Sequence, residues 1–180
     1  MRYLLGSVAL LPTVILLAGC NRTMSADVNK VLDTKDDFEL CDELFKLMIK
    51  HYGEDFDVAK CKEKDQPVIL VWHASGIIDN GGFQYLFEGS FKGDPYFAKT
   101  ATAFKTIKAS KCAEAVDEAL KLFPDSKPPE DIDKRLKVYQ AVPAAKRQAI
   151  DVKFFSESKE IKTILAKYIR ENRAEFKHLK

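Results

Sequence analysis

The sequence predicts an all-α fold, a single-domain irregular bundle of about seven helices, because apolar residues recur at spacings of three and four along most of the chain. The strict apolar-polar alternation of a half-buried strand is not sustained in any segment. Gly and Pro residues separate the periodic segments at intervals that suit short helices. Val68–Trp72 is apolar enough for a buried strand, but the sequence offers no second strand to pair with it.

Two helices are predicted before residue 80. The first covers residues 38–52 and ends at Gly53, since Gly is the usual residue just after a helix. Pro67 suits the first position of the second helix, because Pro lacks the N–H group that a helix start leaves without a partner. We expect this second helix over residues 68–79.

The later helices follow a break at Asn80-Gly81-Gly82. Asp94 and Pro95 suit the N-cap and first position of a helix whose apolar face runs to Ile107. Apolar spacing places the others over 83–90, 110–123, 130–142, 144–155, and from 156 or 158 to the C-terminus.

The first 19 residues have the pattern of a secretory signal peptide. Arg2 precedes an almost wholly apolar stretch, and Leu17-Ala18-Gly19-Cys20 matches a bacterial lipobox, in which the cysteine is lipidated. The alternative is a transmembrane anchor, but about 15 apolar residues are fewer than the roughly 20 that a span needs. We therefore expect the chain to be anchored to a membrane through lipid on Cys20.

This prediction fixes the compartment and the domain boundaries. We expect a lipoprotein on the periplasmic side of the cell envelope, with residues 20–36 as a flexible tether and residues 37–180 as the helical domain. Asn21 follows the cysteine, and under the enterobacterial sorting rule this favours the outer membrane if the source is Gram-negative.

The charge balance argues against a nucleic-acid partner. The chain has 29 basic and 27 acidic residues, and removal of residues 1–19 takes away one basic residue only. A net charge this close to zero does not provide the strong field that binds nucleic acid. The charges are uneven, however: residues 27–65 are acidic and residues 131–180 are basic. The two ends could attract each other, or the basic end could face anionic lipids, but solvated helix faces of mixed sign are the favoured interpretation.

Three cysteines remain after Cys20. A disulfide between Cys41 and Cys61 is the favoured pairing, since the oxidising compartment permits it and it would close a loop of about 20 residues. Cys112 lies on the apolar stripe of a predicted helix, so we expect a buried free thiol. The spacings do not match a zinc site, and we predict no metal and no cofactor.

The most distinctive internal motif is Asn80-Gly81-Gly82-Phe83. Its glycines suit a tight corner between two helices, where positive φ angles or close backbone contact are needed. A structural corner is one interpretation of the motif. The other is a small polar binding site that uses Asn80 and the free N–H groups after Gly82.

Residues 79–90 resemble the signature of the family called domain of unknown function 4375, which is similar to a DNA-mimic protein. Segments 103–123 and 150–176 resemble later parts of the same family, so the resemblance covers about residues 38–178. It implies a compact helical domain with a precedent for protein binding, because one member resembles DNA and binds a transcription factor. Tyr85 and Gly89 depart from the family pattern, and the near-zero charge here does not fit DNA mimicry.

We predict no enzyme activity, because no nucleophile-base pair, carboxylate pair or metal-ligand cluster has workable spacing. His73 and Ser75, for example, are two residues apart and face different sides of a helix. The function that we expect is a membrane-tethered envelope lipoprotein with a helical module that binds a protein partner. An immunity-type lipoprotein that inhibits a toxin is a narrower alternative. An enzyme or small-molecule binder that uses the Asn80-Gly81-Gly82 corner is another.

Overall fold

The computed structural model describes residues 27–179, and every regular element within that range is helical. This confirms the predicted all-α class. The elements are α1 (Val28–Leu32), α2 (Asp37–Tyr52), η1 (Val58–Lys60), α3 (Asp65–Glu88), α4 (Ala98–Thr106), α5 (Ser110–Leu120), η2 (Pro124–Ser126), α6 (Ile132–Ala141), α7 (Ala144–Ser158), α8 (Ile161–Glu171) and η3 (Arg173–His178).

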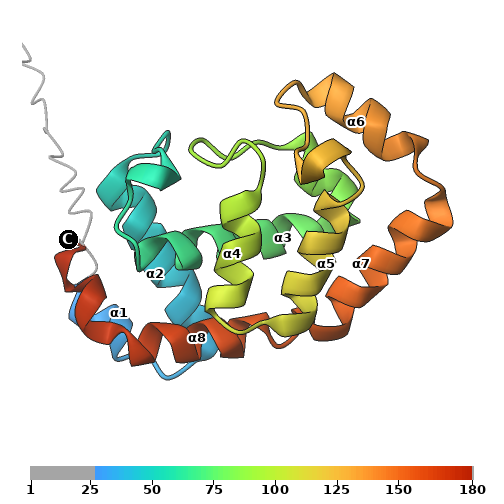
Figure 1. Cartoon of the computed structure of the whole chain (residues 1–180). Helices are drawn as coiled ribbons and strands as arrows, with labels where there is room; N and C mark the ends of the chain where they lie inside the picture. The colour runs from blue at the N-terminus through green and yellow to red at the C-terminus, as the bar shows by residue number, and fades with distance from the viewer. Residues whose placement is uncertain (1–26, 180) are drawn as a thin grey trace, which may run out of the picture.

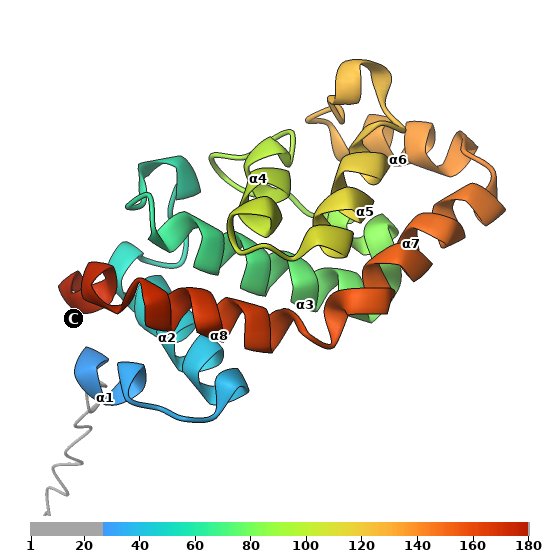
Figure 2. The same cartoon turned by 60° about the horizontal axis from the view of Figure 1, so that its bottom comes forward.

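Helix α3 is the central element, and α2, α4, α6, α7 and α8 pack against it (Figure 1). Helices α4 and α5 lie across one side of it, and α5 packs on α7. Helix α8 crosses α2, as Figure 2 shows, and both contact α3. The Val68–Trp72 run belongs to α3, so the strand alternative is wrong.

The core contains a dense group of aromatic rings. Phe87 meets Phe97, Phe123 and Tyr139 edge-on, with ring centroids 5.5, 4.9 and 5.1 Å apart. Phe154 of α7 meets Phe83 in the same way at 5.7 Å. Edge-to-face rings at these distances are favourable beyond the area that they bury. The cluster joins α3, α6 and α7 to the residues just before α4 and just after α5, and it fixes the second half of α3 in place.

The predicted tether is partly wrong. Residues 20–26 lie outside the described residues, but α1 is an ordered helix within the expected tether. Asp27 caps it by accepting a hydrogen bond from the backbone N–H of Asn29 at 2.9 Å. The spacing of Val28, Val31 and Leu32 puts all three on one face, and all three are buried.

The acidic and basic ends of the domain do meet. Arg170 pairs with Asp37 at 2.7 Å, and Arg173 pairs with Asp33 at 2.8 Å. Arg173 also donates to the backbone carbonyl of Leu32 at 2.6 Å. These contacts join the segment around α1 to the C-terminal helices, so the ends attract each other rather than only facing solvent.

Some predicted helix starts and ends shift by a few residues. The helix expected from Pro95 begins at Ala98, because Phe97 adopts a left-handed conformation with φ of 57°. Asp94 still serves this start: its carboxylate accepts from the backbone N–H groups of Lys99 and Thr100 at 2.9 and 2.7 Å. Helix α5 begins at Ser110 as expected but ends at Leu120.

Candidate functional site

The Asn80–Phe83 motif forms a kink within α3. Gly81 and Gly82 leave helical geometry, and Gly82 has φ of 68° and ψ of −167°, a conformation that favours glycine. A Cβ atom on Gly82 would lie 2.7 Å from Oδ1 of Asp151 in α7. The expected break is therefore confirmed, and the glycine is needed because an α7 carboxylate approaches the backbone.

Asp151 acts as the cap of the second half of α3. Its Oδ1 atom accepts a hydrogen bond from the backbone N–H of Phe83 at 2.9 Å. Burial raises the pKa of Asp151, while this hydrogen bond and the charge of Arg147 oppose the rise. The carboxylate therefore satisfies a helix N-terminus and joins α3 to α7.

The predicted binding residues are used within the corner. The Asn80 side-chain amide donates to the Gly76 carbonyl at 2.7 Å, one turn back along α3. Gly82 and Phe83 are buried. The geometry gives these residues a structural role, and a binding role for Asn80, Gly81, Gly82 and Phe83 stays a prediction.

A groove lies beside the corner, between α2, α3 and the junction of α7 with α8. Its volume is about 490 Å³. Phe38 and Trp72 form an aromatic wall, with their rings edge-on and 5.4 Å apart between centroids. Phe38 is 55% exposed, which is unusual for a large aromatic side chain. The remaining lining residues are Ser75, Gly76, Asp79, Ser158, Lys159, Ile161 and Lys162.

The groove combines an apolar wall with positive charge. Lys159 and Lys162 lie on its α7–α8 side, and Asp79 lies on its α3 side. No atom outside the helix lies within 4 Å of a Cβ placed on Gly76, so the floor there is open. A groove of this kind can hold an apolar side chain whose neighbours carry carboxylates.

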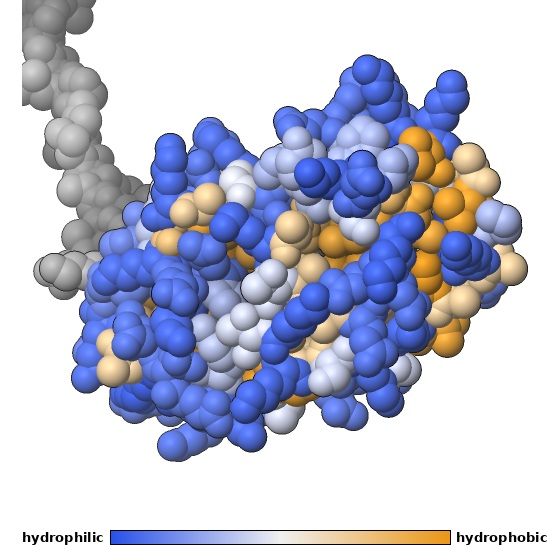
Figure 3. Space-filling model, viewed as in Figure 1, coloured by the Kyte–Doolittle hydropathy of each residue, from blue (hydrophilic) through white to orange (hydrophobic). Residues whose placement is uncertain are grey.

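A second exposed apolar area lies on α6 and α7. Figure 3 shows apolar surface at the end of the molecule formed by these two helices. The large apolar side chains most exposed there are Ile132 at 40%, Val152 at 59% and Phe155 at 41%. None of these three side chains lines the groove, so this area provides a comparison surface for it.

A buried hydrogen-bonded network holds the C-terminal end of the domain. Oδ2 of Asp65, a fully buried residue, accepts from the Tyr52 hydroxyl at 2.6 Å and lies 2.9 Å from Nε2 of His178. Nδ1 of His178 lies 2.8 Å from the Glu175 carbonyl. The network links α2, α3 and η3, and the Tyr52 hydroxyl also lies 3.4 Å from Nε2 of His178. Sequence reasoning missed it, because Asp65 and His178 are 113 residues apart.

One of the two cysteine predictions is confirmed, and the other is wrong. Cys112 is a buried free thiol, as expected. The Cys41–Cys61 disulfide is wrong, since both thiols are free. Cys61 lies beside the end of α2, because the next residue donates its backbone N–H to the Tyr52 hydroxyl at 3.1 Å. Cys41 is 11 residues earlier on α2, about 16 Å along the axis, whereas a disulfide needs Cα atoms within about 7 Å. Cys20 lies outside the described residues.

No helix within residues 27–179 is both long and apolar enough to span a bilayer. Within the same range, His, Cys, Asp and Glu side chains do not gather in groups of three or more that could hold a metal ion.

Comparison with known proteins gives one match. The family model described as DMP19-like protein matches residues 59–172. The matched range includes the corner, Asp151, and the α3 and α7–α8 sides of the groove, but neither Phe38 nor His178. No curated protein and no solved structure matches the chain.

Proposed function

The chain belongs to the DMP19-like protein family, and from that premise we propose that it is a protein-binding module tethered to the cell envelope. Within that family it resembles the group called domain of unknown function 4375. The residues that we assign to partner binding are those of the groove between α2, α3 and the α7–α8 junction.

The observation that carries this proposal is the exposed aromatic wall of the groove. Phe38 and Trp72 line a hollow of about 490 Å³; Phe38 is 55% exposed, and Trp72 is partly buried against the core. Aromatic side chains in such hollows contribute a large share of the binding energy in protein interfaces. Lys159 and Lys162 beside them favour a partner that presents an apolar side chain flanked by carboxylates.

The tether rests on the lipobox at Leu17-Ala18-Gly19-Cys20. Lipid on Cys20 would anchor the chain on the periplasmic side of the membrane, and two or three acyl chains are enough for stable binding. From Cys20 to Asp27 there are seven residues, which span at most about 25 Å when extended. The domain would therefore stay close to the membrane surface. A narrower alternative is an immunity-type lipoprotein that inhibits a toxin at that surface.

DNA mimicry does not fit this chain. A protein that replaces DNA needs a strongly acidic surface, since DNA carries a negative charge about every 1.7 Å. This chain has a net charge of +2. The feature that we carry over from the resemblance is protein binding alone.

Affinity capture from intact cells tests the proposal. The tagged chain is crosslinked in its native envelope, and captured proteins are quantified for the wild type, Phe38→Ala and Val152→Ala. Phe38 and Val152 are 55% and 59% exposed, so neither change should disturb the fold. We expect Phe38→Ala to lower capture of one stoichiometric partner by about tenfold, as for a typical interface anchor. Val152→Ala should leave capture unchanged.

A Cys20→Ala variant tests the tether separately, because it removes the lipidation site. We expect the chain to leave the membrane fraction and to keep its affinity for the partner in solution. Equal capture by the wild type and Phe38→Ala would refute the groove. A chain with no partner would favour the small-molecule or enzymatic alternative at the Asn80-Gly81-Gly82 corner.

A further inference from the structure

Arg135 is a buried cation whose donors are not used. It lies on α6, is 1% exposed, and is among the largest fully buried side chains in the protein. Its Nε and Nη2 atoms have no hydrogen-bond partner among the described residues. Buried donors are almost always satisfied, and an arginine has five of them, so this guanidinium requires an explanation.

The surroundings of Arg135 keep the guanidinium away from water. Its Cζ atom lies 5.2 Å from the centroid of the Phe97 ring, in a cation–π contact. Phe97 in turn packs against Phe91, with centroids 5.7 Å apart. Burial lowers the pKa of Arg135, and the charge of Asp131, one turn earlier on α6, opposes that change. The ring contact compensates only part of the cost of burying a charge.

A cavity of about 390 Å³ opens onto Arg135. Its other walls come from the loop between α3 and α4 and from the residue before the α6 N-cap. The lining residues are Ser90, Phe91, Lys92, Gly93, Pro95, Glu130 and Arg135. A ligand in this space would meet an apolar wall from Phe91 and Pro95 and a cation at the floor.

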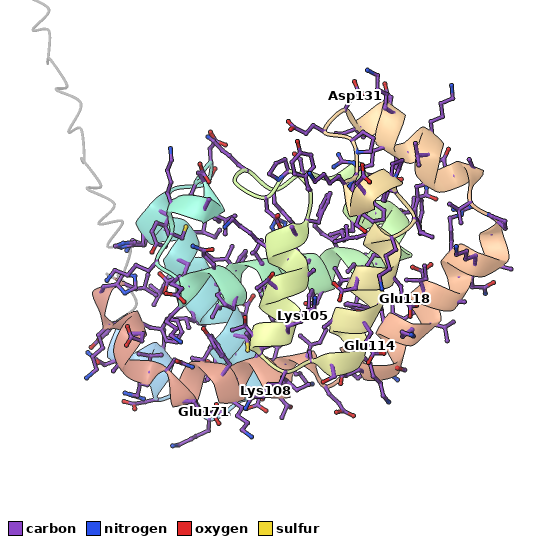
Figure 4. The ribbon with its side chains drawn as sticks, in the orientation of Figure 1. Lys105, Lys108, Glu114, Glu118, Asp131 and Glu171 are labelled. Carbon is purple, nitrogen blue, oxygen red and sulfur yellow. The ribbon has the colours of Figure 1, made fainter. Side chains whose placement is uncertain are left out.

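The other charged groups around the cavity already have partners. Lys92 pairs with Asp55 at 2.7 Å, and Glu130 accepts from the Tyr96 hydroxyl at 2.8 Å. Asp131, which Figure 4 places at the start of α6, caps that helix by accepting from the Lys134 backbone N–H at 2.9 Å. Among the lining residues, Arg135 is thus the cation without an ion-pair partner, and Glu130 is held by a neutral hydroxyl.

We propose that Arg135 is the anchor of a binding site for a carboxylate on a short apolar stem. A guanidinium binds a carboxylate through two parallel hydrogen bonds. Because Nε and Nη2 of Arg135 are buried, the side chain turns toward the cavity when it makes these bonds. The carboxylates of Glu130 and Asp131 disfavour a doubly charged phosphate more than a singly charged carboxylate. Phe91 and Pro95 suit the apolar stem. The carboxylate can belong to a free short-chain acid or to a peptide C-terminus.

Titration of the full chain in detergent micelles, followed by NMR, tests this site. The probes are butyrate, its neutral analogue butyramide, N-acetyl-alanyl-alanine with a free carboxyl group, and inorganic phosphate. The signals are the Arg135 Nε–H cross-peak and the backbone amides of residues 90–95. We expect saturable shifts with butyrate, with the peptide, or with both, and none with butyramide or phosphate. Tighter binding of butyrate would indicate a free short-chain acid as the ligand, and tighter binding of the peptide would indicate a peptide C-terminus.

Variants on α6 provide the control. Arg135→Met should weaken carboxylate binding by at least about tenfold, as expected for loss of a charge-assisted hydrogen bond. Lys134→Met removes a neighbouring exposed charge and should keep full affinity. Three results would overturn the proposal. The first is equal shifts with butyrate and butyramide, and the second is undiminished carboxylate binding by a folded Arg135→Met variant. The third is the absence of a saturable shift with butyrate and with the peptide. The probe comparison uses the wild type, so it holds even if Arg135→Met does not fold.

Discussion

Substitution of Gly82 by alanine should destabilise the protein strongly, because both the backbone and its neighbour oppose a side chain there. Gly82 has φ of 68°, and strain of this kind costs an L-residue about 1–3 kcal/mol. The new Cβ would lie 2.7 Å from the Asp151 carboxylate, which would have to move and release the Phe83 N–H. Loss of a hydrogen bond to a charged group adds about 1.5–3 kcal/mol. We therefore expect Gly82→Ala to lower the free energy of unfolding by about 3–5 kcal/mol.

Two other glycines in α3 provide matched controls. A Cβ on Gly76 meets nothing within 4 Å, so Gly76→Ala should stabilise the helix by about 0.5–1 kcal/mol. A Cβ on Gly81 would overlap the Tyr85 ring, but this side chain is 49% exposed and can turn away. The free energy of unfolding of Gly81→Ala should therefore lie between those of Gly82→Ala and Gly76→Ala.

Urea unfolding followed by circular dichroism measures all three variants. A loss of 3–5 kcal/mol corresponds to a drop in Tm of about 10 °C in a protein of this size. If Gly82→Ala were as stable as the wild type, neither the positive φ nor the approach of Asp151 would constrain the kink. The account of the corner would then be wrong.

Three further predictions concern buried polar groups. Folding raises the pKa of Asp151, so the folded state binds the Asp151 proton more tightly than the unfolded state does. This proton stabilises the folded state at low pH, and the stabilisation is lost as pH rises through the folded-state pKa. Asp151→Asn should remove this part of the pH dependence of the free energy of unfolding, measured with urea. Arg135→Met should raise the free energy of unfolding by about 1–4 kcal/mol, because methionine replaces a buried charged side chain with an apolar one of similar volume. If the variant were instead less stable than the wild type, the guanidinium would support the fold. In the native chain, Cys41 and Cys61 should hardly react with iodoacetamide at neutral pH, as measured by mass spectrometry. Burial raises the pKa of the Cys41 thiol to about 12 and that of the Cys61 thiol to about 11. The reactive form of a cysteine is the thiolate, which is then scarce. After unfolding without reductant both should react, and protection of the two together would indicate the disulfide that the structure lacks.

Local patterns predicted most of the fold. The apolar spacing before Gly53 located α2, and the paired glycines located the kink in α3. Both signals are carried by neighbouring residues, so a single sequence is enough to read them. Helix α1 was missed because its apolar face has only three residues, which is too short for a periodic signal.

Contacts between distant segments could not be predicted. The cap on Phe83 comes from Asp151, which is 68 residues away, and no local pattern indicates that α7 approaches the corner. Arg135 looked like one more basic residue on an exposed helix, and only the packing of α6 on the aromatic cluster shows that it is buried. The groove likewise needed the fold, since Phe38 and Trp72 are 34 residues apart.

Site-specific photocrosslinking tests whether the groove holds a protein partner. A photoreactive phenylalanine analogue is placed at position 38 in one chain and at position 152 in another, and both are irradiated in intact cells. We predict one dominant adduct from position 38, which Trp72→Ala abolishes, and no adduct of that mass from position 152. Adducts of equal yield from the two positions, or an adduct from position 152 alone, would contradict the groove as the binding site.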